Sequence, residues 1–250
     1  YSNQNRYTMK NDYLLQRLFH WKQLWTFILW MLLSGTIVSY RANAQKYVRS
    51  VFNDTYVPIT IIGGATESTA TGDNSNQTGI PLGFNFIYAD SLRSVIGLNT
   101  NGLVWFDAVA PSASDGSNIS RMYSTSGANE GVGAWFANMQ DDASSQILYQ
   151  TQGVPGSQTF TVQYTNYPHY SGAAGLNIRI NFQVVFYEGS NVIEFRYGAI
   201  SGSGPAATAG GACIAIEYGA GGAGNFLDLV TGSGSTAHGM LSPLMAWPTN

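Results

Sequence analysis

Two adjacent carboxylates, Asp141 and Asp142, are the side chains of this sequence best suited to hold a metal ion. Ca²⁺ binds oxygen ligands, and a pair of carboxylates with nearby loop carbonyls could supply them. The same pair also suits a turn at a strand end, where Asp side chains accept backbone N–H bonds. The pattern favours the turn. Asp141 and Asp142 remain the candidate Ca²⁺ site, and no other cofactor is expected.

Four ring-bearing residues crowd the segment YTNYPHYSG and are the candidate ligand-binding residues. They are Tyr164, Tyr167, His169 and Tyr170. Aromatic rings on a solvated loop can stack on sugars or anchor a protein partner. The alternative is that these rings fold over the edge of the domain and only pack there. We expect the segment to be a loop.

Catalytic signatures are missing from the sequence. It contains no G-x-S-x-G and no H-E-x-x-H motif. After residue 44 the only histidines are His169 and His238, and the single cysteine, Cys213, lies in an apolar run typical of a buried, inert thiol. The sequence therefore predicts no catalytic residue and no enzyme.

The first 44 residues predict a secretory signal peptide. Lys10, Arg17 and Lys22 precede an apolar run over 24–38, and Ala42-Asn43-Ala44 supplies a cleavage site. The alternative, a membrane anchor, would need a longer apolar run of about 20 residues. Residues 1–8 lie before the first methionine and are expected to be an over-extended gene prediction.

Removal of residues 1–44 leaves an acidic chain. Residues 45–250 carry six Lys and Arg against thirteen Asp and Glu, a net charge of −7. An acidic surface without basic clusters argues against nucleic acid and anionic lipid as partners. We therefore expect a secreted or cell-surface protein whose partner is an extracellular protein or a glycan, with no membrane insertion of the mature chain.

Alternation of apolar and polar residues from Leu176 to Phe186 predicts a long strand, with Gln183 on the face turned toward water. Residues 188–191 supply a turn, and 192–197 alternate again, so we expect a hairpin that needs a second apolar layer. The residues expected in the core are Trp105, Phe182, Val184, Phe186 and Phe195.

Further strands are expected at regular intervals along the chain. They fall within 47–62, 80–86, 94–106, 133–137, 147–164, 213–218 and 226–230. This spacing predicts an all-β fold, an antiparallel β-sandwich of about ten strands. We place a single domain at 45–232, and we expect 233–250 to be a tail or linker toward a C-terminal region missing from this sequence.

The order of these motifs resembles that of a nidogen-like extracellular domain. The matching segments are IPLGFNF at 80–86, NTNGLVWF at 99–106, AWF at 134–136 followed by Asp141-Asp142, and FQVVFYE with IEFRY within 182–197. The Pro that precedes Phe-Trp in the family is missing here, and the two aromatics are in reverse order.

The resemblance covers roughly residues 50–230 and extends to surface proteins that Bacteroidetes-type bacteria export by the type IX system. It implies adhesion or scaffolding and transfers no catalytic residue. The alternative is a carbohydrate-binding accessory domain of a glycan-degrading protein. A groove lined by aromatics and carboxylates would favour that alternative.

Overall fold

The structure, a computed structural model, describes residues 50–106, 108–111, 129–169, 178–202, 212–219, 221 and 225–228. Within these ranges the chain forms eleven strands and no helix, so nothing there could cross a membrane as a helix. His238, Tyr170, the expected signal peptide and the expected tail lie outside the described residues.

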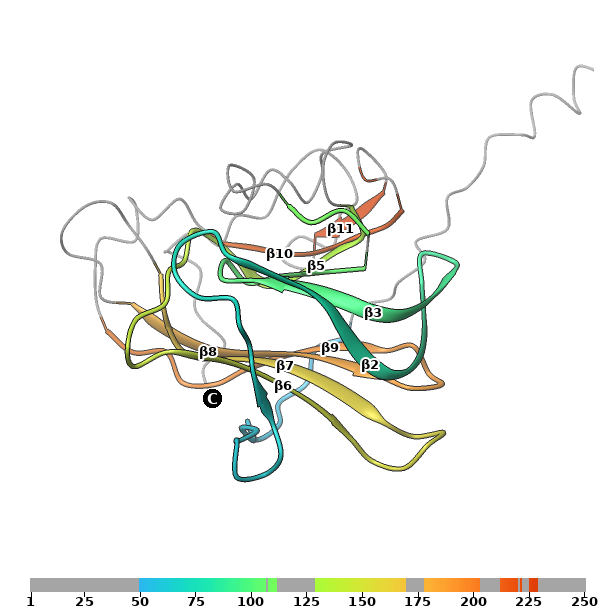
Figure 1. Cartoon of the computed structure of the whole chain (residues 1–250), viewed down its shortest axis with the longest axis horizontal. Coiled ribbons are helices and arrows are strands. Elements are labelled where there is room, and N and C mark those ends of the chain that lie inside the picture. Colours follow the sequence, from blue (N-terminus) through green and yellow to red (C-terminus); the bar gives the residue numbers. More distant parts are fainter. Residues whose placement is uncertain are drawn as a thin grey trace, which may run out of the picture. The chain divides into compact units, whose positions relative to one another are not determined.

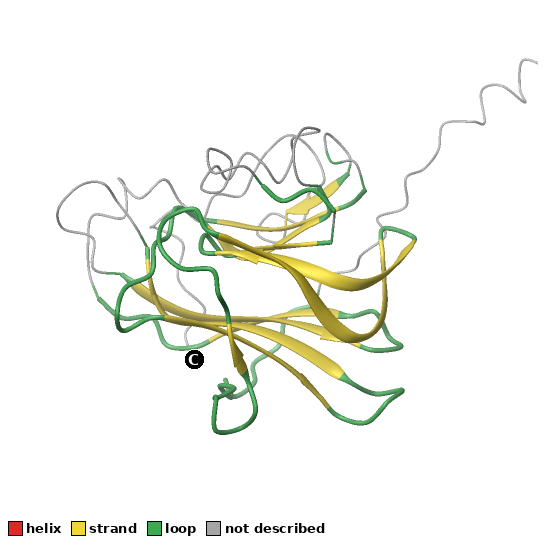
Figure 2. Cartoon of the chain, in the orientation of Figure 1, coloured by secondary structure: helices red, strands yellow, loops and turns green. Residues whose placement is uncertain are grey.

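The strands form two antiparallel sheets that face each other (Figures 1 and 2). The five-stranded sheet has the order β1 (Thr66–Glu67), β6 (Gln146–Gln152), β7 (Thr159–Pro168), β8 (Arg179–Tyr187), β9 (Ile193–Tyr197). The six-stranded sheet has the order β11 (Phe226–Asp228), β10 (Cys213–Glu217), β5 (Gly131–Phe136), β4 (Leu103–Trp105), β3 (Ser91–Asn99), β2 (Asn76–Tyr88). The predicted antiparallel β-sandwich is confirmed.

Aromatic rings from both sheets meet in the core between them. The ring of Phe186 on β8 packs edge-on against Phe86 of β2 and against Phe106, with centroids 5.3 Å apart in both pairs. Phe182 and Val184 are buried on the same side of β8 because strand side chains alternate. Phe195 on β9 is only partly buried and packs against this core.

Trp105 is fully buried but belongs to a second, smaller cluster. Its neighbours there come from β4, β5 and β10: Leu103, Phe136, Cys213 and Ala215. Val104, between Leu103 and Trp105 on β4, belongs instead to the main core. The six-stranded sheet therefore carries apolar residues on both of its faces.

The Asn-Gly hairpin turn between β3 and β4 is buried and tied to both sheets. The Asn99 side chain accepts hydrogen bonds from the backbone N–H groups of Asn101 and Leu103, at 3.0 and 2.9 Å. Gly102 has a φ of +84°, and a Cβ at this position would lie 2.2 Å from the carbonyl oxygen of Trp135. Glycine is required here because there is no room for a Cβ and because the positive φ is unfavourable for other residues.

The segment before β1 differs from the prediction of strands within 47–62. Residues 50–64, here called the strap, pair with none of the described strands. They run along the outer side of the five-stranded sheet, away from the six-stranded sheet (Figure 1). Two glutamine side chains of the sheet hold the backbone of the strap: Gln163 bonds the N–H and C=O of Ile59, and Gln183 donates to the C=O of Val57. The outer face of β7 and β8 is therefore covered.

Candidate functional site

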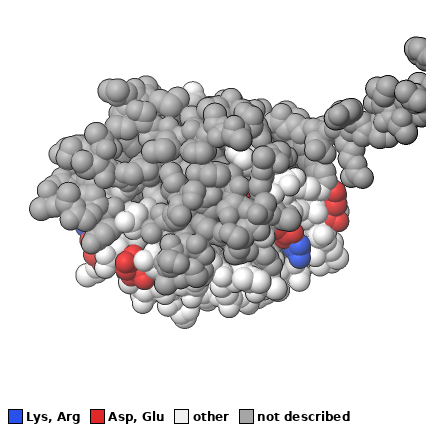
Figure 3. Space-filling view, turned by 90° about the horizontal axis from the view of Figure 1, so that it is seen from above, with Lys and Arg blue, Asp and Glu red and all other residues white. Residues whose placement is uncertain are grey.

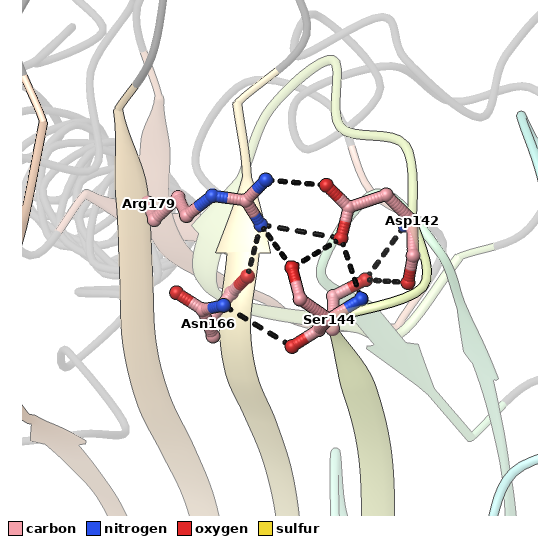
Figure 4. A network of polar contacts seen from close by, with 5 residues as sticks. Asp142, Ser144, Asn166 and Arg179 are labelled. Carbon is pink, nitrogen blue, oxygen red and sulfur yellow. Dashed lines mark hydrogen bonds and ion pairs between the residues drawn. The ribbon is translucent and has the colours of Figure 1, made fainter.

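The predicted acidic pair lies between β5 and β6, where Asp142 forms an ion pair with Arg179 of β8 (Figure 4). Both carboxylate oxygens of Asp142 take part, since the guanidinium donates to each of them. Arg179 also donates to the hydroxyl of Ser144 and the carbonyl of Asn166, at 3.1 and 3.0 Å. The backbone N–H and the hydroxyl of Ser144 donate to the same carboxylate.

These contacts make the Asp142 carboxylate part of a turn. The Arg179 guanidinium and the Ser144 donors hold the pKa of Asp142 well below its usual range. Asp141 accepts a hydrogen bond from the backbone N–H of Gly72. A cation at this pair would compete with Arg179, and the described residues contain no group of three or more His, Cys, Asp or Glu placed to hold a metal. Calcium binding at Asp141 and Asp142 stays a prediction.

Three of the four predicted ligand-binding residues are buried. Tyr164 and Tyr167 belong to β7, and the residue after that strand, His169, continues in a β-bridge with Met139. The Tyr164 ring stacks on Phe182 with centroids 4.5 Å apart, and its hydroxyl donates to the carbonyl of Asn99 at 2.6 Å. The segment is the end of a strand and not the expected loop, and its three described rings are buried, as the alternative of packed rings predicts. Ligand binding by Tyr164, Tyr167, His169 and Tyr170 stays a prediction.

The one histidine and the one cysteine among the described residues are also buried. The backbone N–H of His169 donates to the backbone carbonyl of Ile178 at 3.0 Å, and the imidazole side chain of His169 is almost wholly buried. Cys213 lies on β10 inside the second apolar cluster, as the apolar run around it predicts. Neither side chain is accessible to a substrate in this conformation.

A cavity lies between the strap and the outer face of the five-stranded sheet. It has a volume of about 200 Å³, and strap residues 57–60 and 63 line one side. Its sheet side is mostly polar, with the amides of Gln150, Gln152 and Gln183 and the hydroxyls of Thr159 and Thr161. Among the described residues, neither aromatic rings nor carboxylates line this cavity, so it differs from the groove that the glycan alternative predicted.

The sequence pattern alone did not single out Gln163, Gln183 and Arg196. Gln163 and Gln183 are register partners on β7 and β8, and Arg196 is the partner of Gln183 on β9. One signal was available: two glutamines at outward positions of neighbouring strands, together with an apolar run at 57–62 that has no hairpin partner.

Basic groups form no patch among the described residues. The three arginines there are all ion-paired: Arg93 with Glu130, Arg179 with Asp142, and Arg196 with Glu194. Where basic side chains are visible in Figure 3, acidic side chains lie beside them. The exclusion of nucleic acid as a partner stays a prediction from the sequence.

Comparison with known proteins identifies one family. A family model described as NIDO related matches residues 46–243, which is most of the chain and includes every described residue. No curated protein and no solved structure gave a match. Because the model spans the strap, both sheets and the segments between them, the chain belongs to the nidogen-related (NIDO-related) family.

Proposed function

We propose that this chain is a secreted or cell-surface domain that binds or supports an extracellular protein and catalyses no reaction. Nidogen-related domains are extracellular and are not enzymes, which supports this proposal. The expected signal peptide over residues 1–44 agrees with it.

The observation that carries the proposal is the apolar surface of the strap. Five large apolar side chains of this segment are exposed: Val51, Phe52, Val57, Ile61 and Ile62. Contiguous exposed apolar surface marks interaction sites in soluble proteins, whereas single exposed apolar residues are common everywhere. Five exposed apolar side chains within 15 residues supply material for such a surface. The main core is already complete between the two sheets, so these side chains are available to a partner.

A protein partner fits this surface better than a long glycan chain does. Glycan chains are usually bound through aromatic rings and carboxylates, and the described residues with exposed rings are few on this face. Aliphatic side chains and Phe52 instead suit the apolar centre of a protein interface. The glycan alternative has one observation in its favour, the polar cavity beside the strap.

Surface retention tests the proposal. The full gene is expressed in its own host, and the fraction of exported chain that stays on the cells is compared with the fraction in the medium by quantitative immunoblot. Phe52→Ser with Ile62→Ser should move the chain into the medium, because the apolar contact is lost. The melting temperature should hardly change, since both side chains are exposed.

The matched control is Leu92→Ser with Val95→Ser, which removes two exposed apolar side chains from β3. This variant should be retained like the unchanged protein. Equal retention of the strap variant and the control would contradict a role for the strap.

A further inference from the structure

The described strands give the two sheets four edges, and the edge strands β2 and β9 are the long ones. The other two, β1 and β11, have only two and three residues. An edge strand leaves N–H and C=O groups unpaired, so it can add a strand from another chain unless these groups are covered. The two long edges differ in this respect.

The edge of β2 is closed by side chains of the opposite sheet. The side chain of Asn191 accepts a hydrogen bond from the N–H of Ile87 at 2.7 Å, and the hydroxyl of Thr151 donates to the C=O of Leu82 at 2.8 Å. Pro81 has no N–H to offer, and the register of β2 against β3 shifts at two places. These features protect an edge, so β2 is unsuited to pairing with another strand.

The edge of β9 is open. The N–H of Gly198 donates to the C=O of Asn181 at 2.8 Å, and these two residues are register partners at the end of the β8–β9 pair. Because hydrogen bonding alternates along antiparallel strands, the N–H and C=O groups of Ile193, Phe195 and Tyr197 point away from β8. Among the described residues, none bonds these outward groups.

The side chains of β9 suit pairing with a second copy of the same strand. Its sequence, Ile-Glu-Phe-Arg-Tyr, has Phe195 at the centre and opposite charges on either side. In an antiparallel pair centred on Phe195, Glu194 lies opposite Arg196 of the second copy. A shift of two residues in either direction would place Glu194 opposite Glu194, or Arg196 opposite Arg196, which is unfavourable. The charges therefore select one register.

The ion pair within each copy leaves atoms available for the second copy. Arg196 uses its Nη2 atom both for the carboxylate of Glu194 and for the hydroxyl of Tyr187, each at 2.8 Å. Glu194 accepts its bonds from Arg196 and Tyr187 at Oε2. No described residue bonds Nη1 of Arg196 or Oε1 of Glu194, and the Arg196 side chain is 34% exposed. These atoms can join the ion pairs of two copies in one neutral network.

We propose that two copies of this chain form a dimer through β9, with the two strands antiparallel and Phe195 at the two-fold axis. The outward backbone groups of Phe195 bond those of Phe195 in the second copy, and those of Ile193 bond those of Tyr197. The two five-stranded sheets become one continuous sheet, and the partly buried side chains of these residues lose their remaining exposure. A symmetric contact of this kind closes on itself.

This inference goes beyond the proposed binding of an extracellular protein and uses no residue of the strap, so the two can fail separately. The first test is analytical ultracentrifugation of the secreted chain over a range of concentrations. A monomer–dimer equilibrium is expected, with a dissociation constant of about 10–100 μM, because a contact between two short strands is small.

Charge exchange on β9 tests the register. Glu194→Arg alone places two arginines opposite each other, and Arg196→Glu alone places two glutamates opposite each other. Each change should weaken self-association at least about tenfold. An equimolar mixture of the two variants should form a heterodimer, because opposite charges then face each other again. That recovery would also show that both variants are folded.

The matched control carries both changes, Glu194→Arg with Arg196→Glu. It keeps an ion pair within each copy and restores opposite charges between the copies, so it should dimerise like the unchanged chain. Amide hydrogen exchange gives a second measurement without any variant. The amides of Ile193, Phe195 and Tyr197 should become more protected as the concentration rises, whereas the amide of Ile87 on the β2 edge should not change.

Four results would overturn the inference. They are a chain that stays monomeric up to about 1 mM, a dimer that neither single charge variant weakens, a mixture of these variants that stays monomeric, and concentration-dependent protection at another edge only. If cell retention still depends on Phe52 and Ile62 in any of these cases, the β9 dimer alone is rejected and the protein-binding proposal stands.

Discussion

Gln183 illustrates what strand periodicity can and cannot reveal about one residue. The alternation along 176–186 correctly places Gln183 on the face opposite Phe182 and Val184. The same pattern predicts that Gln183 meets water, yet its exposed fraction is 0%. The strap covers it, and periodicity within one strand carries no information about a distant segment that crosses that strand.

Two substitutions on β8 test this difference. Phe186→Ala should lower the free energy of unfolding by ~3–5 kcal/mol, because a buried ring that contacts Phe86 and Phe106 leaves a cavity. Gln183→Ala should cost ~1–3 kcal/mol, since the carbonyl of Val57 and the side chain of Gln163 lose a donor. Urea unfolding of both variants measures these changes. A neutral Gln183→Ala would mean that the strap is not held at this point.

Asp142 predicts a dependence of stability on pH. Its pKa is lowered in the folded chain, chiefly by the hydrogen-bonded Arg179, relative to about 3.9 for an unfolded Asp. The ion pair therefore stabilises the fold above about pH 4, and this contribution is lost as pH falls from there toward the lower folded pKa. The effect is modest because the Asp142 side chain is 41% exposed.

The measurement compares Asp142→Asn with the unchanged protein by chemical unfolding at several pH values. The unchanged protein should be the more stable of the two at neutral pH, and the difference should shrink below about pH 4. A difference that is constant over this range would show that the charge of Asp142 does not stabilise the fold.

At the level of elements, a glycine can be required for its backbone conformation or for lack of space beside it, and the turn between β3 and β4 shows both reasons at once. Gly102 and Gly79 both have positive φ, +84° and +75°, but only Gly102 has backbone within the space that a Cβ would take. Gly79→Ala should cost about 1–2 kcal/mol for the backbone conformation alone. Gly102→Ala should cost more than about 3 kcal/mol, because the turn must also move away from Trp135.

Thermal unfolding of the two glycine variants gives the comparison. Similar losses of stability at the two positions would show that the turn has room to shift. A loss at Gly102 alone would show that the β3–β4 turn and β5 form one rigid unit.

Local sequence signals predicted the hairpins well. The ranges 94–106 and 147–164, each expected to contain strands, hold the hairpins β3–β4 and β6–β7, with Asn101-Gly102 and residues 153–156 at their turns. The segment at Tyr164 to His169 was predicted poorly, because the polar residues and Pro168 within it are typical of a loop. Its rings are buried by Phe182 and by the Asn99 turn, which are contacts between distant parts of the chain.

The candidate site was less predictable than the fold for the same reason. Nothing near Asp142 in the sequence indicates Arg179, which lies 37 residues away and neutralises the carboxylate. The cavity likewise depends on residues from the strap and from β6 to β9, and the sequence indicates only that each lies on a strand or a loop.

For the whole molecule, export should change the N-terminus. Because the apolar run over 24–38 is short and Ala42-Asn43-Ala44 follows it, the exported protein should begin at Gln45. Intact mass and N-terminal sequencing of protein from the medium or the cell surface would establish this. Recovery of residues 24–38 in a membrane fraction would instead indicate an anchor.

The way the sheet holds the strap also determines which sequence changes this chain can accept there. Gln163 and Gln183 recognise the peptide groups of residues 57 and 59 and not their side chains. Most replacements at Val57 should therefore be tolerated in a saturation-mutagenesis screen for exported, protease-resistant protein. Proline at position 59 should be rejected because it has no N–H to donate to Gln163, although the neighbouring position already carries Pro58. The apolar surface of the strap is thus free to diversify toward new partners while its course over the sheet stays the same.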